Sequence, residues 1–305
     1  MKKITGYLKS YVAGLDRRIF GITSLAMALA VYINYHFHLN KKIDHLPDAG
    51  EYAAWYFIFL AAFTLPYLLY ALFGRQRFFA GKTFIFLWLL APAIFSWKMV
   101  SDVDFNLLLP PAQQLFWNQV IYWPFKMVII TTVLILVWKF TRDKQPFYGF
   151  STRDFTPRPY LLMLLIMVPL IALASTQPDF LRMYPKLKDL GFLDRDQNRL
   201  GYRLIYELSY GSDFFSIELF FRGFLVLAFA KWFGKDAILP MACFYCTIHF
   251  GKPLGECISS FFGGMILGVV TYHTRTIWGG LMVHLGIAWL MELGGYIGHG
   301  WITGG

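Results

Sequence analysis

The chain has 305 residues, of which 57% are hydrophobic, 19% aromatic and only 15% charged. This apolar share is far above that of an ordinary soluble domain, so it excludes a water-soluble globular fold and indicates a membrane protein. The net charge of +10 would suit a nucleic-acid partner, but the basic residues lie in the short polar connections where membrane topology places them. No nucleic-acid partner is therefore predicted.

Apolar runs long enough to cross a bilayer recur along the whole chain. A helix needs roughly 20 residues to cross a hydrocarbon core of about 30 Å, and continuous runs favour helices over the alternating strands of a β-barrel. We therefore predict an all-α, polytopic transmembrane helical bundle of about eight to nine spans. The candidate spans are residues 19–39, 52–73, 83–100, 116–140, 160–175, 214–233, 237–250, 258–271 and 277–297.

The distribution of Lys and Arg predicts the orientation of these spans. Basic residues precede the first span, follow the second and surround the connection from the fourth to the fifth, which places these segments in the cytoplasm. The alternate connection, residues 101–114, carries two aspartates and no Lys or Arg, as expected on the outside. The N-terminus is therefore predicted to be cytoplasmic. The first run is predicted to be a retained helix, because it ends in YHFHLNKK and not in a small-residue cleavage site.

A polar segment divides the chain into two membrane parts. Residues 141–158 read TRDKQPFYGFSTRDFTPR, which is typical of a cytoplasmic connector. We predict N-terminal transmembrane helices at 1–140 and a second membrane domain at 159–305. Within the second part, residues 176–210 form an interfacial helix, a lid or a simple linker, and the sequence does not decide among these.

Ionisable residues gather inside the spans of the last third. Each costs at least a few kcal/mol in a span and normally faces the bundle interior. Glu218 and Arg222 are four residues apart, so they share one helix face and can pair. His249 and His284 lie on two later spans, and Glu292 follows His284 on roughly the same face, where it orients that histidine only indirectly. A carboxylate with two imidazoles supports general acid–base hydrolysis or binds a metal such as zinc, and spacing alone does not separate the two.

Each of these signals also has a structural interpretation. A buried Glu218–Arg222 pair can lock two helices together without any chemistry. Glu256, in the turn GKPLGE, is either a substitute base or an exposed carboxylate at a helix N-terminus. Cys243 and Cys246 form a CxxC pattern, but with no second pair helix packing is favoured over a metal site.

The order of the motifs resembles a known family. It is similar to the CAAX protease and bacteriocin-processing (CPBP) family of intramembrane proteases. The motifs that carry the resemblance are, in chain order, ELFFRG, a tyrosine four residues before a histidine, GKPLGE with SSFFGGMILG, and RTIWGGLMVH. The family signature has two adjacent glutamates with an arginine four residues after the second, an aromatic residue four before a histidine, and a histidine four before Asn or Asp. The resemblance covers residues 160–297.

The resemblance implies a role for each matching residue. Glu218 takes the place of the second glutamate and Arg222 that of the arginine. His249, with Tyr245 in the aromatic position, and His284 take the places of the two histidines. The implied activity is hydrolysis by water that Glu218, His249 and His284 activate, with a membrane-associated peptide or protein as substrate. The implied location is the lipid bilayer of a bacterial plasma membrane, where the protein is a multi-pass integral protein.

Cofactors and supporting residues follow from the same resemblance. No cofactor is expected, because a glutamate that activates water needs no metal; zinc or another divalent ion held by Glu218, His249 and His284 is the disfavoured alternative. The residues expected to support these three are Arg222, Tyr245, Glu256 and Glu292.

Two positions depart from the family pattern. Ile217 stands where the family has its first glutamate, and Ala288 where it has the final Asn or Asp. An oxyanion donor is worth about 3 kcal/mol, so its loss slows turnover by about two to three powers of ten, and the loss of the only base costs more. Glu218 is therefore expected to act as the base, with Glu256 as a second substitute.

These residues predict an intramembrane endopeptidase that acts on a membrane-associated or lipidated substrate. The alternative that Ile217 and Ala288 favour is a catalytically silent relative, which binds a membrane partner or confers immunity to a secreted peptide. A transporter with a proton relay is the third hypothesis, but it would favour inverted repeats that the N-terminal half does not display. The sequence identifies neither the substrate nor the oligomeric state.

Overall fold

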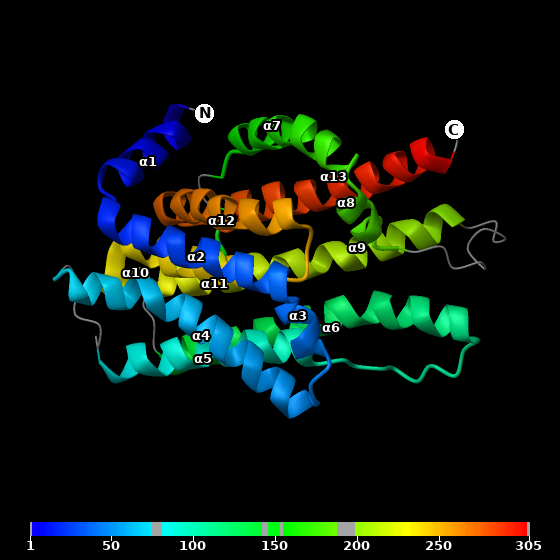
Figure 1. Cartoon of the computed structure of the whole chain (residues 1–305), viewed down its shortest axis with the longest axis horizontal. Helices are drawn as coiled ribbons and strands as arrows, with labels where there is room; N and C mark the ends of the chain where they lie inside the picture. Colours follow the sequence, from blue (N-terminus) through cyan, green and yellow to red (C-terminus); the bar gives the residue numbers. More distant parts are fainter. Residues whose placement is uncertain (1, 75–80, 142–145, 153–154, 188–198, 304–305) are drawn as a thin grey trace. The chain divides into compact units, whose positions relative to one another are not determined.

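A computed structural model of the chain describes residues 2–74, 81–141, 146–152, 155–187 and 199–303, and they form helices and connections with no β-strand (Figure 1). The predicted all-α, polytopic helical bundle is confirmed. The helices are α1 (Lys2–Ala13), α2 (Arg17–Phe37), α3 (Leu39–Asp44), α4 (Asp48–Leu72), α5 (Lys82–Val100), α6 (Pro111–Phe140), η1 (Phe147–Gly149), α7 (Arg158–Ala174), α8 (Pro178–Met183), α9 (Arg199–Glu218), η3 (Leu219–Ala228), α10 (Ala230–Phe233), η4 (Gly234–Ala237), α11 (Ile238–Thr247), α12 (Leu254–Thr274) and α13 (Trp278–Thr303).

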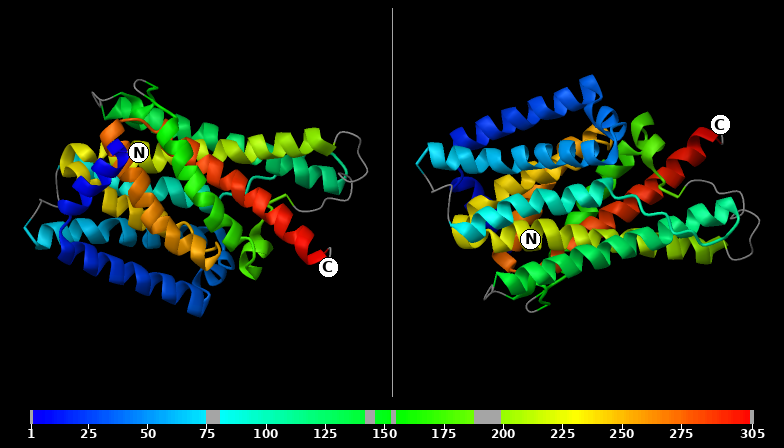
Figure 2. Two further views of the ribbon diagram at one scale, coloured as in Figure 1. Left: turned by 90° about the horizontal axis from the view of Figure 1, so that it is seen from above. Right: turned by 90° about the horizontal axis from the view of Figure 1, so that it is seen from below.

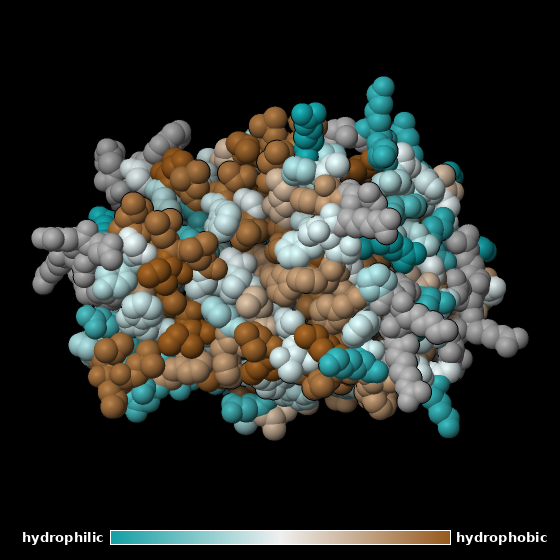
Figure 3. Space-filling model, turned by 180° about the vertical axis from the view of Figure 1, so that it is seen from behind, coloured by the Kyte–Doolittle hydropathy of each residue, from teal (hydrophilic) through white to brown (hydrophobic). Residues whose placement is uncertain are grey.

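Six of the described helices are long and apolar enough to cross a membrane, namely α2, α4, α5, α6, α12 and α13, and α7 is a shorter apolar helix. The chain is thus a multi-pass integral membrane protein. Two predicted spans are not single long helices: residues 214–233 divide among α9, η3 and α10, and residues 237–250 contain the ten-residue α11. Apolar side chains cover much of the surface in Figure 3, as a surface that faces lipid requires. The cytoplasmic N-terminus remains a prediction.

The helices form two compact units, each built from separate parts of the sequence. The first unit comprises Met1–Ser101, Trp138–Arg153 and Phe220–Ile277, and the second comprises Asp102–Val137, Asp154–Leu219 and Trp278–Gly305. The predicted connector at 141–158 remains a prediction, and its residues 142–145 and 153–154 lie outside the described part of the chain.

Helix α11 is the buried centre of the first unit. It packs against α2, α4 and α12, and each of its ten residues is buried. Glycines of α12 allow this close approach: a Cβ on Gly264 would lie 3.0 Å from the Tyr245 ring, and a Cβ on Gly268 would lie 2.7 Å from the Met241 side chain. Small residues at such positions let membrane helices pack closely. The motif SSFFGGMILG therefore has a packing role.

Helix α13 is the centre of the second unit. It packs against α7, α8 and α9, and Figure 2 shows α7 crossing it. Helices α9 and α13 run antiparallel, because Gly211 faces Leu285 and Trp289 while Glu218, farther along α9, faces His284 near the start of α13. Trp123 of α6 packs against Tyr206 and Tyr210 of α9. This arrangement brings α9 and α13 together where their polar residues lie.

Helix α9 passes directly into a π-helix, η3, one residue after Glu218. A π-helix has hydrogen bonds from i to i+5, is rare, and occurs mostly at functional sites. The ten residues of η3 include Arg222, which is fully buried. The predicted pairing of Glu218 with Arg222 assumed a regular α-helix between them, and it remains a prediction.

Candidate active site

Glu218 and His284 form a hydrogen-bonded pair in the second unit. Glu218 is the last residue of α9, and His284 lies in the second turn of α13. Nδ1 of the imidazole is 3.0 Å from Oε1 of the carboxylate, and the side chain of Glu218 is 0% exposed against 14% for His284. Two of the three residues predicted to be catalytic are thus in direct contact.

This contact determines the chemistry of the imidazole. An ionised carboxylate only accepts hydrogen bonds, so a bond to such a carboxylate places the imidazole proton on Nδ1 and leaves the lone pair of a neutral ring on Nε2. When Nε2 takes up a second proton, the nearby carboxylate stabilises the imidazolium. The pair can therefore accept a proton and return it.

Apolar side chains surround this polar pair. The ring of Phe214 meets the His284 ring edge to face, with 4.7 Å between centroids. Phe214 belongs to a cluster with Tyr210 and Ala288, and the cluster extends to partly buried Trp123, Ile217, Leu281 and Leu285. Ile217 and Ala288, the two departures from the family pattern, thus lie in one apolar cluster. In such surroundings the carboxylate–imidazole interaction is stronger than in water.

A second group of predicted residues gathers in the first unit. The guanidinium carbon of Arg222 lies 4.2 Å from the centre of the Tyr245 ring, a cation–π contact. The Tyr245 ring in turn lies 4.7 Å from the His249 ring. Nδ1 of His249 is 2.8 Å from the Tyr245 carbonyl oxygen, which only accepts, so this histidine also carries its proton on Nδ1. The aromatic residue four positions before His249 thus contacts both the arginine and the histidine.

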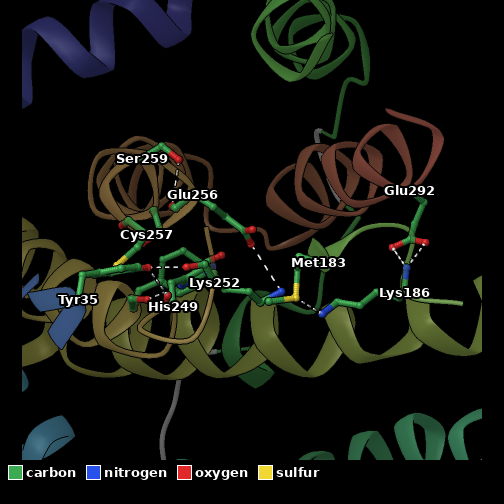
Figure 4. Close-up of polar contacts among 11 residues, drawn as sticks. Tyr35, Met183, Lys186, His249, Lys252, Glu256, Cys257, Ser259 and Glu292 are labelled. Atoms are coloured by element: carbon green, nitrogen blue, oxygen red, sulfur yellow. Dashed lines mark hydrogen bonds and ion pairs between the residues drawn. The ribbon is translucent and has the colours of Figure 1, made fainter. Parts of the chain in front are cut away.

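The two remaining supporting residues make local contacts. Oε1 of Glu256, in the first turn of α12, is 3.6 Å from Nζ of Lys252 in the preceding turn. This ion pair favours the interpretation of Glu256 as a helix N-terminal charge. Glu292 accepts the backbone N–H of Lys186 with both carboxylate oxygens, at 2.8 and 3.1 Å, and joins the segment after α8 to α13 (Figure 4). This contact is with the backbone of Lys186, and the predicted indirect link from Glu292 to His284 remains a prediction.

Two residues of α2, Asn34 and Tyr35, hold the turn that carries His249, and sequence analysis missed them. Helix α11 ends at Thr247, so the carbonyls that follow need other donors. Asn34 Nδ2 donates to the Phe250 carbonyl at 2.8 Å, and the Tyr35 hydroxyl donates to the Lys252 carbonyl at 2.5 Å (Figure 4 shows Tyr35). The only signal was an Asn–Tyr pair inside an apolar run.

We expect Asn34→Leu to loosen this turn. The buried Phe250 carbonyl loses its donor, which costs about 1–3 kcal/mol. Hydrogen exchange at the amides of residues 249–252, together with thermal unfolding in detergent, measures the effect. Tyr32→Phe is the matched control, because Tyr32 is on the same helix and is 57% exposed. Exchange in Asn34→Leu as slow as in the control would contradict this role.

A metal site would need more ligands than the two residues of the pair. Oε1 of Glu218 and Nδ1 of His284 lie within hydrogen-bond distance of each other. Within the described residues, no group of three or more His, Cys, Asp or Glu side chains is placed to hold a metal ion. The absence of a cofactor remains a prediction, and no step below passes through a metal.

Part of the chain matches a known protein family. Residues 213–290 match the family model described as Type II CAAX prenyl endopeptidase Rce1-like. This confirms the family that the motifs predicted, and it supports a CAAX-type protease as the kind of function. The matched segment contains both groups, including Glu218, Arg222, His249 and His284, and it stops before Glu292. No curated protein and no solved structure matches the chain.

Proposed function

We propose that this protein is an intramembrane endopeptidase in which Glu218 and His284 activate the attacking water. The premise is that residues 213–290 resemble a CAAX prenyl endopeptidase. The observation that carries the proposal is the 3.0 Å contact between the buried Glu218 carboxylate and Nδ1 of His284. A buried carboxylate in contact with an imidazole is an arrangement that can act as a general base. A resemblance to a protease family, or an acidic residue in a span, does not by itself provide such a base.

In the proposed reaction, Nε2 of His284 takes a proton from water as the oxygen attacks the scissile carbonyl carbon. Glu218 holds the Nδ1 proton and offsets the charge of the imidazolium that forms. When the tetrahedral intermediate collapses, the imidazolium returns its proton to the departing amine. One water is consumed and the peptide C–N bond breaks. One proton of the water reaches the departing amine through His284, and the other stays on the carboxylic acid that forms. His249 is proposed as a further proton-transfer group, on the strength of its motif.

The partner implied by this chemistry is a peptide or protein that is anchored in the bilayer, including one with a lipidated tail. A site on transmembrane helices is reached from lipid more readily than from water, which favours such substrates. We place the protein in a bacterial plasma membrane, as the family resemblance implies. We propose no nucleic-acid partner.

One observation favours the alternative, a catalytically silent relative that binds a membrane partner or confers immunity to a peptide. Ile217 and Ala288 replace an acid and an amide of the family pattern, and both pack in the apolar cluster around Phe214. A protein that had lost its chemistry could fill the site with apolar side chains in this way. Unlike the proposed enzyme, such a protein keeps its function when Glu218 is neutralised.

The proposal is tested by cleavage of a membrane-anchored peptide library in liposomes. The purified protein is compared with His284→Gln, with and without a chelator. We expect cleavage by the wild type, loss of cleavage in His284→Gln and no effect of the chelator. Sensitivity to the chelator would instead require a metal. No cleavage by a folded wild-type protein, with any library member, would favour the silent relative.

A further inference from the structure

Gly280 lies one helical turn before His284 on α13, and its environment differs from that of its neighbours. A Cβ on Gly280 would overlap Oε2 of Glu218 and would lie 3.2 Å from Cδ and 3.9 Å from Oε1 of the same residue. The three nearest atoms thus all belong to the Glu218 carboxylate, which takes the space nearest to the position that a side chain would fill.

Other glycines of α13 serve ordinary helix packing. A Cβ on Gly279 would overlap the ring of Tyr160, and a Cβ on Gly286 would lie 2.6 Å from the Leu164 side chain, both on α7. Side chains of this kind can shift within an apolar interface. The Glu218 carboxylate cannot shift in the same way, because it is fully buried and is bonded to His284.

We propose that Gly280 is a positioning residue for the proposed reaction: the space left by its missing side chain is the seat that holds the Glu218 carboxylate against Nδ1 of His284. One oxygen of the carboxylate lies at Gly280 and the other at His284, residues four apart on α13. Gly280 is in the first turn of α13, where the positive end of the helix dipole favours a carboxylate. Only the effect on cleavage rests on the proposed function; the seat has a test of its own.

That test is a double-mutant cycle on thermal stability in detergent. We expect Gly280→Ala to lower Tm by about 2–6 °C, because the added methyl group displaces the carboxylate. In a Glu218→Ala background the same change is expected to leave Tm unchanged or to raise it, because alanine favours a helix more than glycine does. If Glu218→Ala does not accumulate, Glu218→Asp is the second background, since it withdraws the carboxylate by one methylene group.

Two other glycines are matched controls on the same helix. Gly279→Ala is expected to lower Tm equally in both backgrounds, because its obstacle is Tyr160. Gly300→Ala is expected to leave cleavage unchanged and Tm unchanged or raised, because no atom lies within 4 Å of its Cβ position and alanine favours a helix more than glycine does. If Gly280→Ala instead lowers Tm equally with and without the Glu218 carboxylate, the seat does not exist.

Nitrogen-15 NMR of labelled histidines separates positioning from a general loss of packing. The Nδ1–H signature of His284, assigned with His284→Gln, is expected to change in Gly280→Ala as it does in Glu218→Ala, and to persist in Gly279→Ala. For cleavage, we expect Gly280→Ala to lower kcat by about 100-fold with little change in KM. A coupled Tm cycle with no cleavage by any variant would support the seat and overturn the proposed protease.

Discussion

Glu218→Gln is expected to lower kcat by about 10²- to 10⁴-fold while the protein still folds. Glutamine keeps the size of the side chain, and its amide oxygen can still accept the Nδ1 proton of His284. It lacks the negative charge that stabilises the imidazolium after Nε2 takes a proton from water, so the loss falls on the proton-transfer step. The measurement is single-turnover cleavage of a membrane-anchored peptide that the wild type cleaves.

Glu207→Gln is the matched control for this loss. Glu207 lies on the same helix, α9, and its change to Gln is chemically the same as that of Glu218, the residue bonded to His284. We expect this variant to cleave like the wild type. Cleavage by Glu218→Gln at the rate of the Glu207 control would show that the Glu218–His284 pair does not activate the water.

Ile217→Glu is expected to lower the free energy of unfolding by about 2.5–3.5 kcal/mol, the range for an acidic residue inside a span. The new carboxylate would enter the apolar cluster around Phe214, where Ile217 now packs.

Ala288→Asn alone is expected to lower the free energy of unfolding by about 1–3 kcal/mol, because its amide would be buried in the same cluster without a partner. Chemical unfolding of each variant in detergent measures these costs.

The double variant Ile217→Glu with Ala288→Asn is expected to cost less than the sum of the two single changes, by about 0.5–3 kcal/mol. Both positions lie in one cluster, so the amide of Asn can donate to the carboxylate of Glu. Strict additivity would show that the two positions do not interact. The activity of the double variant is also measured. If the double variant cleaves and the wild type does not, the natural protein is a silent relative. If the wild type cleaves, the apolar cluster is compatible with catalysis.

Local patterns in the sequence were sufficient to predict most of the helices. Apolar runs of about 20 residues need helical hydrogen bonding in lipid, so length and composition alone indicate six of the membrane-crossing helices that the structure contains. The π-helix η3 was not predictable in this way, because its i to i+5 bonding leaves no distinct apolar period in ten residues. The short α11 is apolar throughout because neighbouring helices surround it on several sides.

The partners of the polar residues were less predictable than the helices. Spacing on α13 suggested an indirect link from Glu292 to His284, which remains a prediction. It gave no sign that Glu292 accepts the backbone N–H of Lys186, 106 residues away in the chain. The family resemblance singled out Tyr245 without a physical reason, and the structure shows its ring in contact with Arg222 and His249. Its supporting role remains a prediction. Asn34 was missed because its role depends on a carbonyl 216 residues away.

The sequence by itself determined that this is a helical membrane protein. It also determined that ionisable residues gather inside the spans of the last third, where the CAAX-protease-like motifs lie. These properties depend on composition and on short-range spacing, which are present in the chain before it folds. Only the tertiary structure decided that Glu218 meets His284, 66 residues later, and that its carboxylate occupies the space beside Gly280. Both contacts depend on how closely α9 and α13 pack and in which register, and no local pattern in either helix specifies that.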